Sequence, residues 1–135
     1  MDENNSAHEV KNKDSITQDL IIDIYDNLKC EINIDFNNFD YSSILCFTKF
    51  LHKIVLITKD CTASAIGYNV YGEISNLLPQ QEINIFTRLD IKDQFCNTLY
   101  LISAVCGDNY TLYMVSDVPN GFKKRLIYSA HKLIG

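Results

Sequence analysis

Residues 42–59 read SSILCFTKFLHKIVLITK, and this stretch decides the fold class. It lies within two segments, Tyr41 to Phe50 and Lys53 to Lys59, that are rich in aromatic and β-branched residues, as strands are. His52 lies in the short link between the two segments. The stretch therefore predicts two consecutive strands of a sheet.

Further strands are predicted on both sides of this pair. In Glu31 to Phe36, apolar and polar residues alternate with a period of two, which indicates a strand with one face in water. Ala65 to Tyr71 (AIGYNVY) follows a turn after Asp60, and its link to the preceding strand is too short for a parallel crossover, so we expect an antiparallel pair. Gly72 to Gln81 contains Pro79 and is predicted to be a loop.

The last half of the chain adds two strands and two helices. Ile83 to Leu89 and Tyr110 to Ser116 are the predicted strands. Asp93 to Gly107 fits either a strand from Thr98 to Ile102 or a helix capped by Asp93 and ended by Gly107, and its length of about fourteen residues favours the helix. Asn120 to Ile134 has an apolar stripe at helical spacing, with Asn120 as the capping residue.

Together these segments predict an α+β fold, with an antiparallel sheet of about six strands packed against two helices, the last of them C-terminal. The apolar residues between Gln18 and Tyr25 cluster too tightly to distinguish a helix from a strand. Residues 1–16 are charged, rich in asparagine and nearly without apolar side chains, so we expect a disordered polar tail. The 135-residue chain is 47% apolar, which fits a single α+β domain over residues 17–135.

Composition also limits the setting in which the protein works. The chain has no apolar run near 20 residues, and its first sixteen residues lack the apolar centre of a signal peptide, so we expect a cytosolic or nuclear protein without a membrane span. A net charge of −5 argues against nucleic-acid binding, which needs a basic face. The cysteines are odd in number and contain no CxxC pair, which indicates neither a disulfide framework nor a zinc site. They are Cys30, Cys46, Cys61, Cys96 and Cys106.

The sequence contains one weak candidate for a pair of catalytic residues. The glycines are too widely spread for a phosphate-binding loop, and no Gly-x-Ser-x-Gly motif occurs. A nucleophile pair of Cys46 and His52 is conceivable, but a histidine at a strand end is far more often a surface residue. We therefore expect a non-enzymatic protein with no catalytic residues, no cofactor and no metal site.

The order of elements resembles that of the proteasome assembly chaperone 3 family, small chaperones that help to build the α-ring of the 20S proteasome. The resemblance rests on Ser42 to Lys59 and on AIGYNVY. It rests more on Thr87 to Ile134, which reads TRLDIKDQFCNTLYLISAVCGDNYTLYMVSDVPNGFKKRLIYSAHKLI. In the last of these segments the family has a strand, a helix closed by glycine, an apolar strand and an amphipathic helix.

This resemblance implies a non-enzymatic assembly chaperone that pairs with a related subunit as a heterodimer and binds proteasome α-type subunits. The alternative is a roadblock- or longin-like scaffold subunit of a small-GTPase or trafficking complex. That alternative needs a longer helix between the fourth and fifth strands than Gly72 to Glu82 supplies.

The predicted strands also suggest how the chain meets other proteins. Lys53 to Lys59 and Ala65 to Tyr71 contain neither proline nor a central inward charge that would blunt a sheet edge. We therefore expect a dimer, homotypic in isolation and heterotypic in the cell, with a largely apolar contact.

Overall fold

The structure is a computed structural model that describes residues 16–92, 95–119 and 124–129, the last of these by their backbone only. It contains one α-helix, α2 (Gln18–Asp26), and one 3-10 turn, η1 (Tyr41–Ser43), within these residues. The strands are β1 (Ile44–Phe50), β2 (Lys53–Thr58), β3 (Ala63–Tyr68), β4 (Glu82–Leu89), β5 (Tyr100–Cys106), β6 (Thr111–Ser116) and β7 (Lys124–Ser129).

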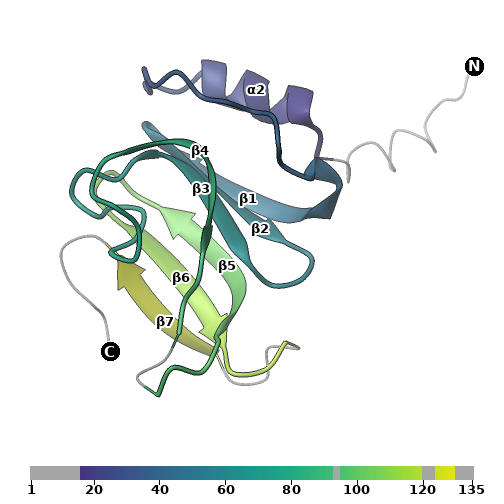
Figure 1. Cartoon of the computed structure of the whole chain (residues 1–135), viewed down its shortest axis with the longest axis vertical. Helices are drawn as coiled ribbons and strands as arrows, with labels where there is room; N and C mark the ends of the chain where they lie inside the picture. The colour runs from purple at the N-terminus through teal and green to yellow at the C-terminus, as the bar shows by residue number, and fades with distance from the viewer. Residues whose placement is uncertain (1–15, 93–94, 120–123, 130–135) are drawn as a thin grey trace, which may run out of the picture.

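Three layers make up the molecule (Figure 1). A four-stranded antiparallel sheet, in the order β1-β2-β3-β4, forms the middle layer. Helix α2 covers one of its faces, and a three-stranded antiparallel sheet, β5-β6-β7, covers the other. The α+β class and the antiparallel pairing are confirmed, but the strands form two sheets rather than one sheet of about six.

Two apolar cores separate the layers, and β2 contributes to both. Val55 and Ile57 pack between the two sheets, whereas Ile54 and Leu56 pack beneath α2. Every residue of β2 is buried because both faces of the strand are covered. This explains why the strand is a continuous apolar run instead of an alternating one.

The ambiguous segment near the N-terminus is a helix. Thr17 caps it, accepting a hydrogen bond from the Leu20 amide at 3.2 Å. Ile21 and Tyr25, one helical turn apart, are buried against the sheet. The Tyr25 hydroxyl donates to the Ile32 carbonyl oxygen and so fastens the following segment beneath the helix.

The segment from Glu31 to Phe36 was wrongly predicted to be a strand. Its burial does alternate, with Ile32 buried and its neighbours exposed, but the only ladder contact described for it is one isolated parallel bridge between Asp35 and Ile85. Side-chain packing against the α2 core, rather than a strand ladder, therefore produces the alternation. The first part of the next predicted strand is also different, because residues 41–43 form η1, capped by Asp40.

Of the two alternatives for Asp93 to Gly107, the strand is confirmed and the favoured helix is wrong, and the helix predicted for Asn120 to Ile134 is wrong where the structure describes it. Residues 100–106 form β5, which pairs with β6 from Tyr100↔Ser116 to Cys106↔Thr111. Residues 124–129 form β7, which pairs with the other side of β6. Both segments have helical spacing of apolar residues, but β6 offers backbone partners on both its edges, and that tertiary pairing overrides local propensity. Of these predicted helices, residues 93–94, 120–123 and 130–134 lie outside the described residues, as does the predicted tail up to residue 15.

The sheet edges are not where the sequence suggested. β2 and β3, which cover Lys53 to Lys59 and most of Ala65 to Tyr71, are interior strands, and the edges are β1 and β4. Lys53 is moreover a buried inward charge, since its Nζ donates to the carbonyl oxygens of Gly107 and Asp108. The prediction of two open edges at these strands is therefore wrong.

Both edges of the four-stranded sheet are irregular. The register of β1 on β2 shifts between Ile44 and Cys46, which leaves Leu45 as an extra residue. The register of β4 on β3 shifts between Ala65 and Gly67. Bulges of this kind twist an edge and interrupt its row of free backbone groups, which disfavours pairing with another strand.

Candidate functional site

The one candidate nucleophile pair is not assembled. Cys46 lies near the start of β1, whereas His52 follows the end of that strand. The four residue steps from Cys46 to Phe50 alone span roughly 13 Å. The His52 Nδ1 lies 3.1 Å from the Lys29 carbonyl oxygen. Burial raises the pKa of the Cys46 thiol, which disfavours the reactive thiolate. The arrangement thus gives Cys46 neither a base nor activation.

Within residues 16–92, 95–119 and 124–129, no three His, Cys, Asp or Glu side chains are grouped so that they could hold an ion. All five cysteines are free thiols. Across the same residues, no helix is long and apolar enough to cross a membrane.

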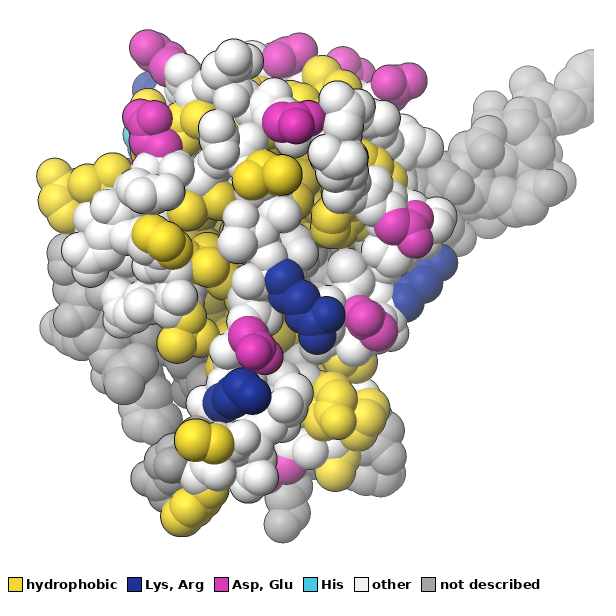
Figure 2. Space-filling model, viewed as in Figure 1, with side chains coloured by type: hydrophobic (Ala, Val, Ile, Leu, Met, Phe, Trp, Pro, Cys, Tyr) yellow, Lys and Arg dark blue, Asp and Glu magenta, His cyan; other side chains and the backbone are white. Residues whose placement is uncertain are grey.

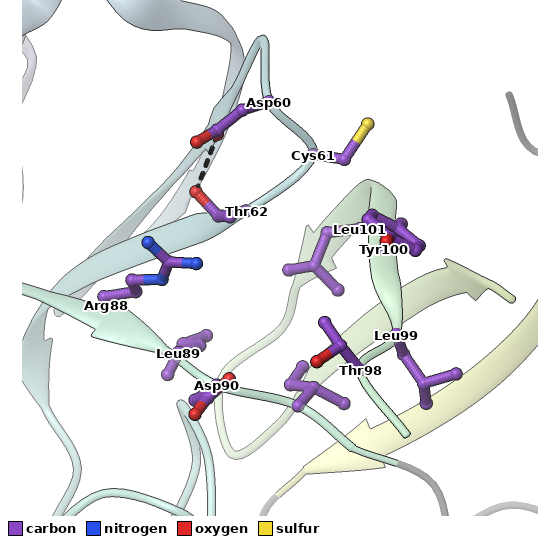
Figure 3. A pocket seen from close by; sticks show the side chains of 11 residues that line it. Asp60, Cys61, Thr62, Arg88, Leu89, Asp90, Thr98, Leu99, Tyr100 and Leu101 are labelled. Carbon is purple, nitrogen blue, oxygen red and sulfur yellow. Dashed lines mark hydrogen bonds between the residues drawn. The ribbon is translucent and has the colours of Figure 1, made fainter. Parts of the chain in front are cut away.

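A small pocket lies where the β2–β3 turn meets the end of β4 and the start of β5 (Figure 3). Its volume is about 110 Å³, well below the roughly 300–1,000 Å³ of typical ligand sites. Asp60 is already engaged, because the hydroxyls of Thr58 and Thr62 donate to its carboxylate and lower its pKa. Nearby, the Leu101 amide donates to the Cys61 carbonyl oxygen at 2.8 Å. The bond between Leu101 and Cys61 joins the two sheets, so the pocket lies at their junction.

A larger hollow, about 520 Å³, opens beside the start of α2. Three of its polar side chains are hydrogen-bonded within the chain. Gln18 and Tyr41 both donate to the Phe36 carbonyl oxygen, and the Ser42 hydroxyl donates to Asp40. These groups stabilise η1 and the segment before it. Lys59 also lines the hollow and is its charged residue.

The β3–β4 loop, residues 69–81, is different because it is built around one fully buried side chain. Asn69 is 0% exposed. Its Nδ2 donates to the carbonyl oxygens of Ser75, Leu78 and Pro79 at 3.0, 3.3 and 2.9 Å. Its Oδ1 accepts from the amides of Ile74 and Ser75 at 2.9 and 3.0 Å. A single side chain therefore bonds five backbone groups of a loop that contains no helix or strand, with the two Nδ2 hydrogens shared among the three carbonyl oxygens.

The same loop is fastened to the second sheet. Thr111 and Tyr113 of β6 donate from their hydroxyls to the carbonyl oxygens of Glu73 and Ile74, at 2.7 and 2.8 Å. Both β6 side chains are 0% exposed. The Tyr71 amide in turn donates to the Glu73 carboxylate at 2.8 Å. Buried hydrogen bonds from Asn69 and from β6 thus fix the middle of the loop to its own chain and to the second sheet.

The outer side of this fixed loop carries exposed apolar side chains beside the uncharged polar ones of Asn76, Gln80 and Gln81. Val70, Tyr71 and Leu77 are 44%, 61% and 59% exposed. Glu73 is the only charged residue among residues 69–81, and it is buried. In Figure 2, yellow side chains appear on the side where Figure 1 places this loop, and the charged side chains in view lie along the top and across the centre.

Two further exposed apolar side chains lie at the same end of the sheets. Phe50 ends β1, directly across from Lys53. The Lys53 Nζ reaches the Gly107 carbonyl oxygen, one residue beyond the last residue of β5, and Val105 near the end of that strand is 56% exposed. We call Phe50, Val70, Tyr71, Leu77 and Val105 the loop-end surface.

Sequence reasoning missed this surface. It treated Gly72 to Gln81 as an unremarkable loop and ended the preceding strand three residues late, at Tyr71 instead of Tyr68. The useful signal was Asn69, a residue that favours turns because its amide can bond nearby backbone groups. The contacts with β6 determine which loop side chains face water. The local sequence of the loop does not indicate them.

No protein-family model matches the chain, and no curated protein matches it.

Proposed function

We propose that this chain is a non-enzymatic protein-binding subunit, an assembly chaperone of the class that its sequence resembles. The observation that carries the proposal is the loop-end surface, where a fixed loop exposes apolar side chains and buries its only charge. Exposed apolar side chains that gather in one contiguous patch are typical of surfaces that other proteins cover.

The physical properties of this surface suit binding. Interface centres are depleted of charged residues, as the exposed side of residues 69–81 is with Glu73 buried, and tyrosines such as the exposed Tyr71 are common in them. The hydrogen bonds of Asn69 already fix the loop. A partner would therefore bind without the entropic cost of ordering it.

The sequence resemblance supplies the class of partner. It implies a related chaperone subunit, in a heterodimer, and proteasome α-type subunits. Two of the segments that carry it, residues 42–59 and 65–71, fall largely in β1, β2 and β3. The third, Thr87 to Ile134, adds no support, because it forms strands where the resemblance implies helices. The partner class therefore rests on the first two segments.

A binding experiment with defined proteins tests the proposal. The purified chain is mixed with a proteasome assembly chaperone subunit, with α-type subunits and with mature β-type subunits, and the mass of each mixture is measured by light scattering after gel filtration. We expect complexes with the first two and none with the β-type subunits. Substituting Leu77→Asp should abolish the complexes, whereas Leu45→Asp should not, since Leu45 is equally exposed but lies outside the loop-end surface.

Failure of the unmodified chain to bind either the chaperone subunit or the α-type subunits would overturn the proposed partner class. The scaffold alternative lacks a supporting feature here, because residues 69–81 contain no helix.

A further inference from the structure

We propose that the free edge of β7 is a second binding site, which takes an extended acidic segment of another protein as an added strand. Such a segment would pair with the backbone of β7 and continue the three-stranded sheet. This edge is separate from the loop-end surface, so the inference does not depend on the proposed function.

β7 is the one regular sheet edge in the described part of the chain. Its register on β6 runs without a shift from Lys124↔Ser116 to Ser129↔Thr111. The other three edges, β1, β4 and β5, are each interrupted by a register shift. Because it is regular, the β7 edge offers an unbroken row of backbone donors and acceptors to another strand.

The opposite edge of the same sheet is already occupied. In β5, the Leu101 amide donates to the Cys61 carbonyl oxygen at 2.8 Å, and the Cys106 amide donates to the Thr48 hydroxyl oxygen at 3.3 Å. β7 ends the order β5-β6-β7 on the side away from these contacts (Figure 1). No described residue pairs with its outer edge, which is therefore the free side of this sheet.

Alternate residues of β7 present their backbone groups to this free edge. The Gly107 amide donates to the Tyr110 carbonyl oxygen at the β5–β6 turn, and hydrogen-bonded and non-bonded pairs alternate along an antiparallel ladder. Continued along β6 and across to β7, this alternation directs the backbone amides of Lys124, Leu126 and Tyr128 away from β6. These three residues supply the donors and acceptors that an added strand would use.

Charge determines which strand suits this edge. β7 begins with Lys124 and Arg125 and contains no acidic residue. Residues 120–135 contain four of the twelve Lys and Arg residues of the chain and none of the seventeen Asp and Glu residues. Opposite charges in facing positions of an antiparallel pair are stabilising, whereas like charges are destabilising. An acidic strand therefore complements β7, while a second copy of β7 would only add two more positive residues.

Nucleic acid is the other anionic macromolecule that a basic segment could bind. It has no strand backbone with which to pair the outward amides and carbonyls of β7. The net charge of −5 also repels its phosphates. The free edge thus favours an acidic protein segment.

Fluorescence anisotropy with a labelled synthetic peptide tests the inference. The probe has about eight residues, in which glutamate alternates with valine, and its matched control has lysine in place of glutamate. We expect the acidic peptide to bind at least about tenfold more tightly than the basic one, and its affinity to fall severalfold when salt is raised from about 50 to about 500 mM. Binding should slow hydrogen exchange at the Leu126 and Tyr128 amides, and not at the Ile127 amide, which is already directed at β6.

Two substitutions at one position separate the backbone of β7 from its side chain. Leu126→Pro removes an outward amide and no bond to β6, a position where edge strands tolerate proline. Leu126→Ala shortens the same side chain and keeps the amide. We expect Leu126→Pro to weaken peptide binding at least about tenfold and Leu126→Ala by less than about threefold. Leu77→Asp, which changes only the loop-end surface, should leave peptide binding unchanged.

Circular dichroism during urea unfolding checks that both Leu126 variants remain folded, and if Leu126→Pro does not, the peptide preference and the exchange of the unmodified chain decide. Equal binding of the two peptides, unchanged exchange at Leu126 and Tyr128, or full binding by a folded Leu126→Pro variant would each overturn the inference. Tighter binding of a single-stranded RNA oligonucleotide than of the acidic peptide would do the same. None of these results bears on the proposed function, which fails only if the unmodified chain does not bind the chaperone subunit or the α-type subunits.

Discussion

Asn69 holds the peptide groups of Ser75 from both sides: its Nδ2 donates to the Ser75 carbonyl oxygen and its Oδ1 accepts from the Ser75 amide, each at 3.0 Å. The side-chain amide thereby replaces the backbone partner that a neighbouring strand would provide. This matters because Ser75 is only 2% exposed, so water cannot satisfy its backbone groups. Because Asn69 bonds these backbone groups, the inner side of the loop can be buried although the loop has no regular secondary structure.

Replacing Asn69 by aspartate should destabilise the protein strongly. The carboxylate has nearly the same shape, but it cannot donate to the carbonyl oxygens of Ser75, Leu78 and Pro79, and it places a charge in a buried position. We expect a loss of about 2–4 kcal/mol in the free energy of unfolding, measured with urea. Asn76→Asp makes the same chemical change at an exposed position of the loop and should change stability by less than about 0.5 kcal/mol.

The two hydroxyls of β6 should hold the loop jointly. Tyr113→Phe and Thr111→Val each remove a buried donor and leave the Ile74 or Glu73 carbonyl oxygen without it. We expect each to cost about 1–2 kcal/mol of unfolding free energy. Because both bonds fix the same segment, the double variant should lose less than the sum of the two. Full additivity in a double-mutant cycle would show that the two bonds act independently.

Gly67 should tolerate no side chain. Its φ is +122°, and an added Cβ would overlap the His52 carbonyl oxygen and lie 2.6 Å from the Lys53 Cα. Both obstacles are backbone atoms of the adjacent turn and strand, so they cannot rotate away. Gly67→Ala should therefore cost more than about 2 kcal/mol in urea unfolding. A variant with unchanged stability would contradict the close approach of β3 to the β1–β2 turn.

The β2–β3 turn should make part of the stability depend on pH. The hydroxyls of Thr58 and Thr62 hold the pKa of Asp60 below its ordinary value. Since the folded-state pKa is lower than the unfolded one, the carboxylate stabilises the fold above the unfolded pKa of about 3.9, and this contribution is lost as the pH falls through the folded pKa. An NMR titration of the Asp60 carboxyl carbon measures the shift.

Thr62→Val should move the pKa of Asp60 back toward its ordinary value, because it removes one of the donors. Thr98→Val provides the control, since Thr98 lies on the opposite wall of the same pocket (Figure 3). An equal effect of both substitutions would mean that general burial, and not the Thr62 hydroxyl, sets this pKa.

Several features of this protein were determined by the sequence alone. The apolar run in Lys53 to Lys59, the turn after Asp60 and the alternation in Ile83 to Leu89 predicted β2, β3 and β4 and the antiparallel link between the first two. Each signal is local, because a buried strand must be apolar and a turn must carry residues that accept its backbone angles. The failure of Cys46 and His52 to meet also follows from position along one strand.

Only the tertiary structure decided the rest. Residues 100–106 and 124–129 carry helical spacing, yet they are strands because β6 lies between them and pairs with both. The loop-end surface likewise exists because Asn69, Thr111 and Tyr113 turn the loop so that its charge is buried and its apolar side chains face outward. Hydrogen bonds between residues far apart in the chain determine these outcomes, and such bonds have no counterpart in the spacing of neighbouring residues.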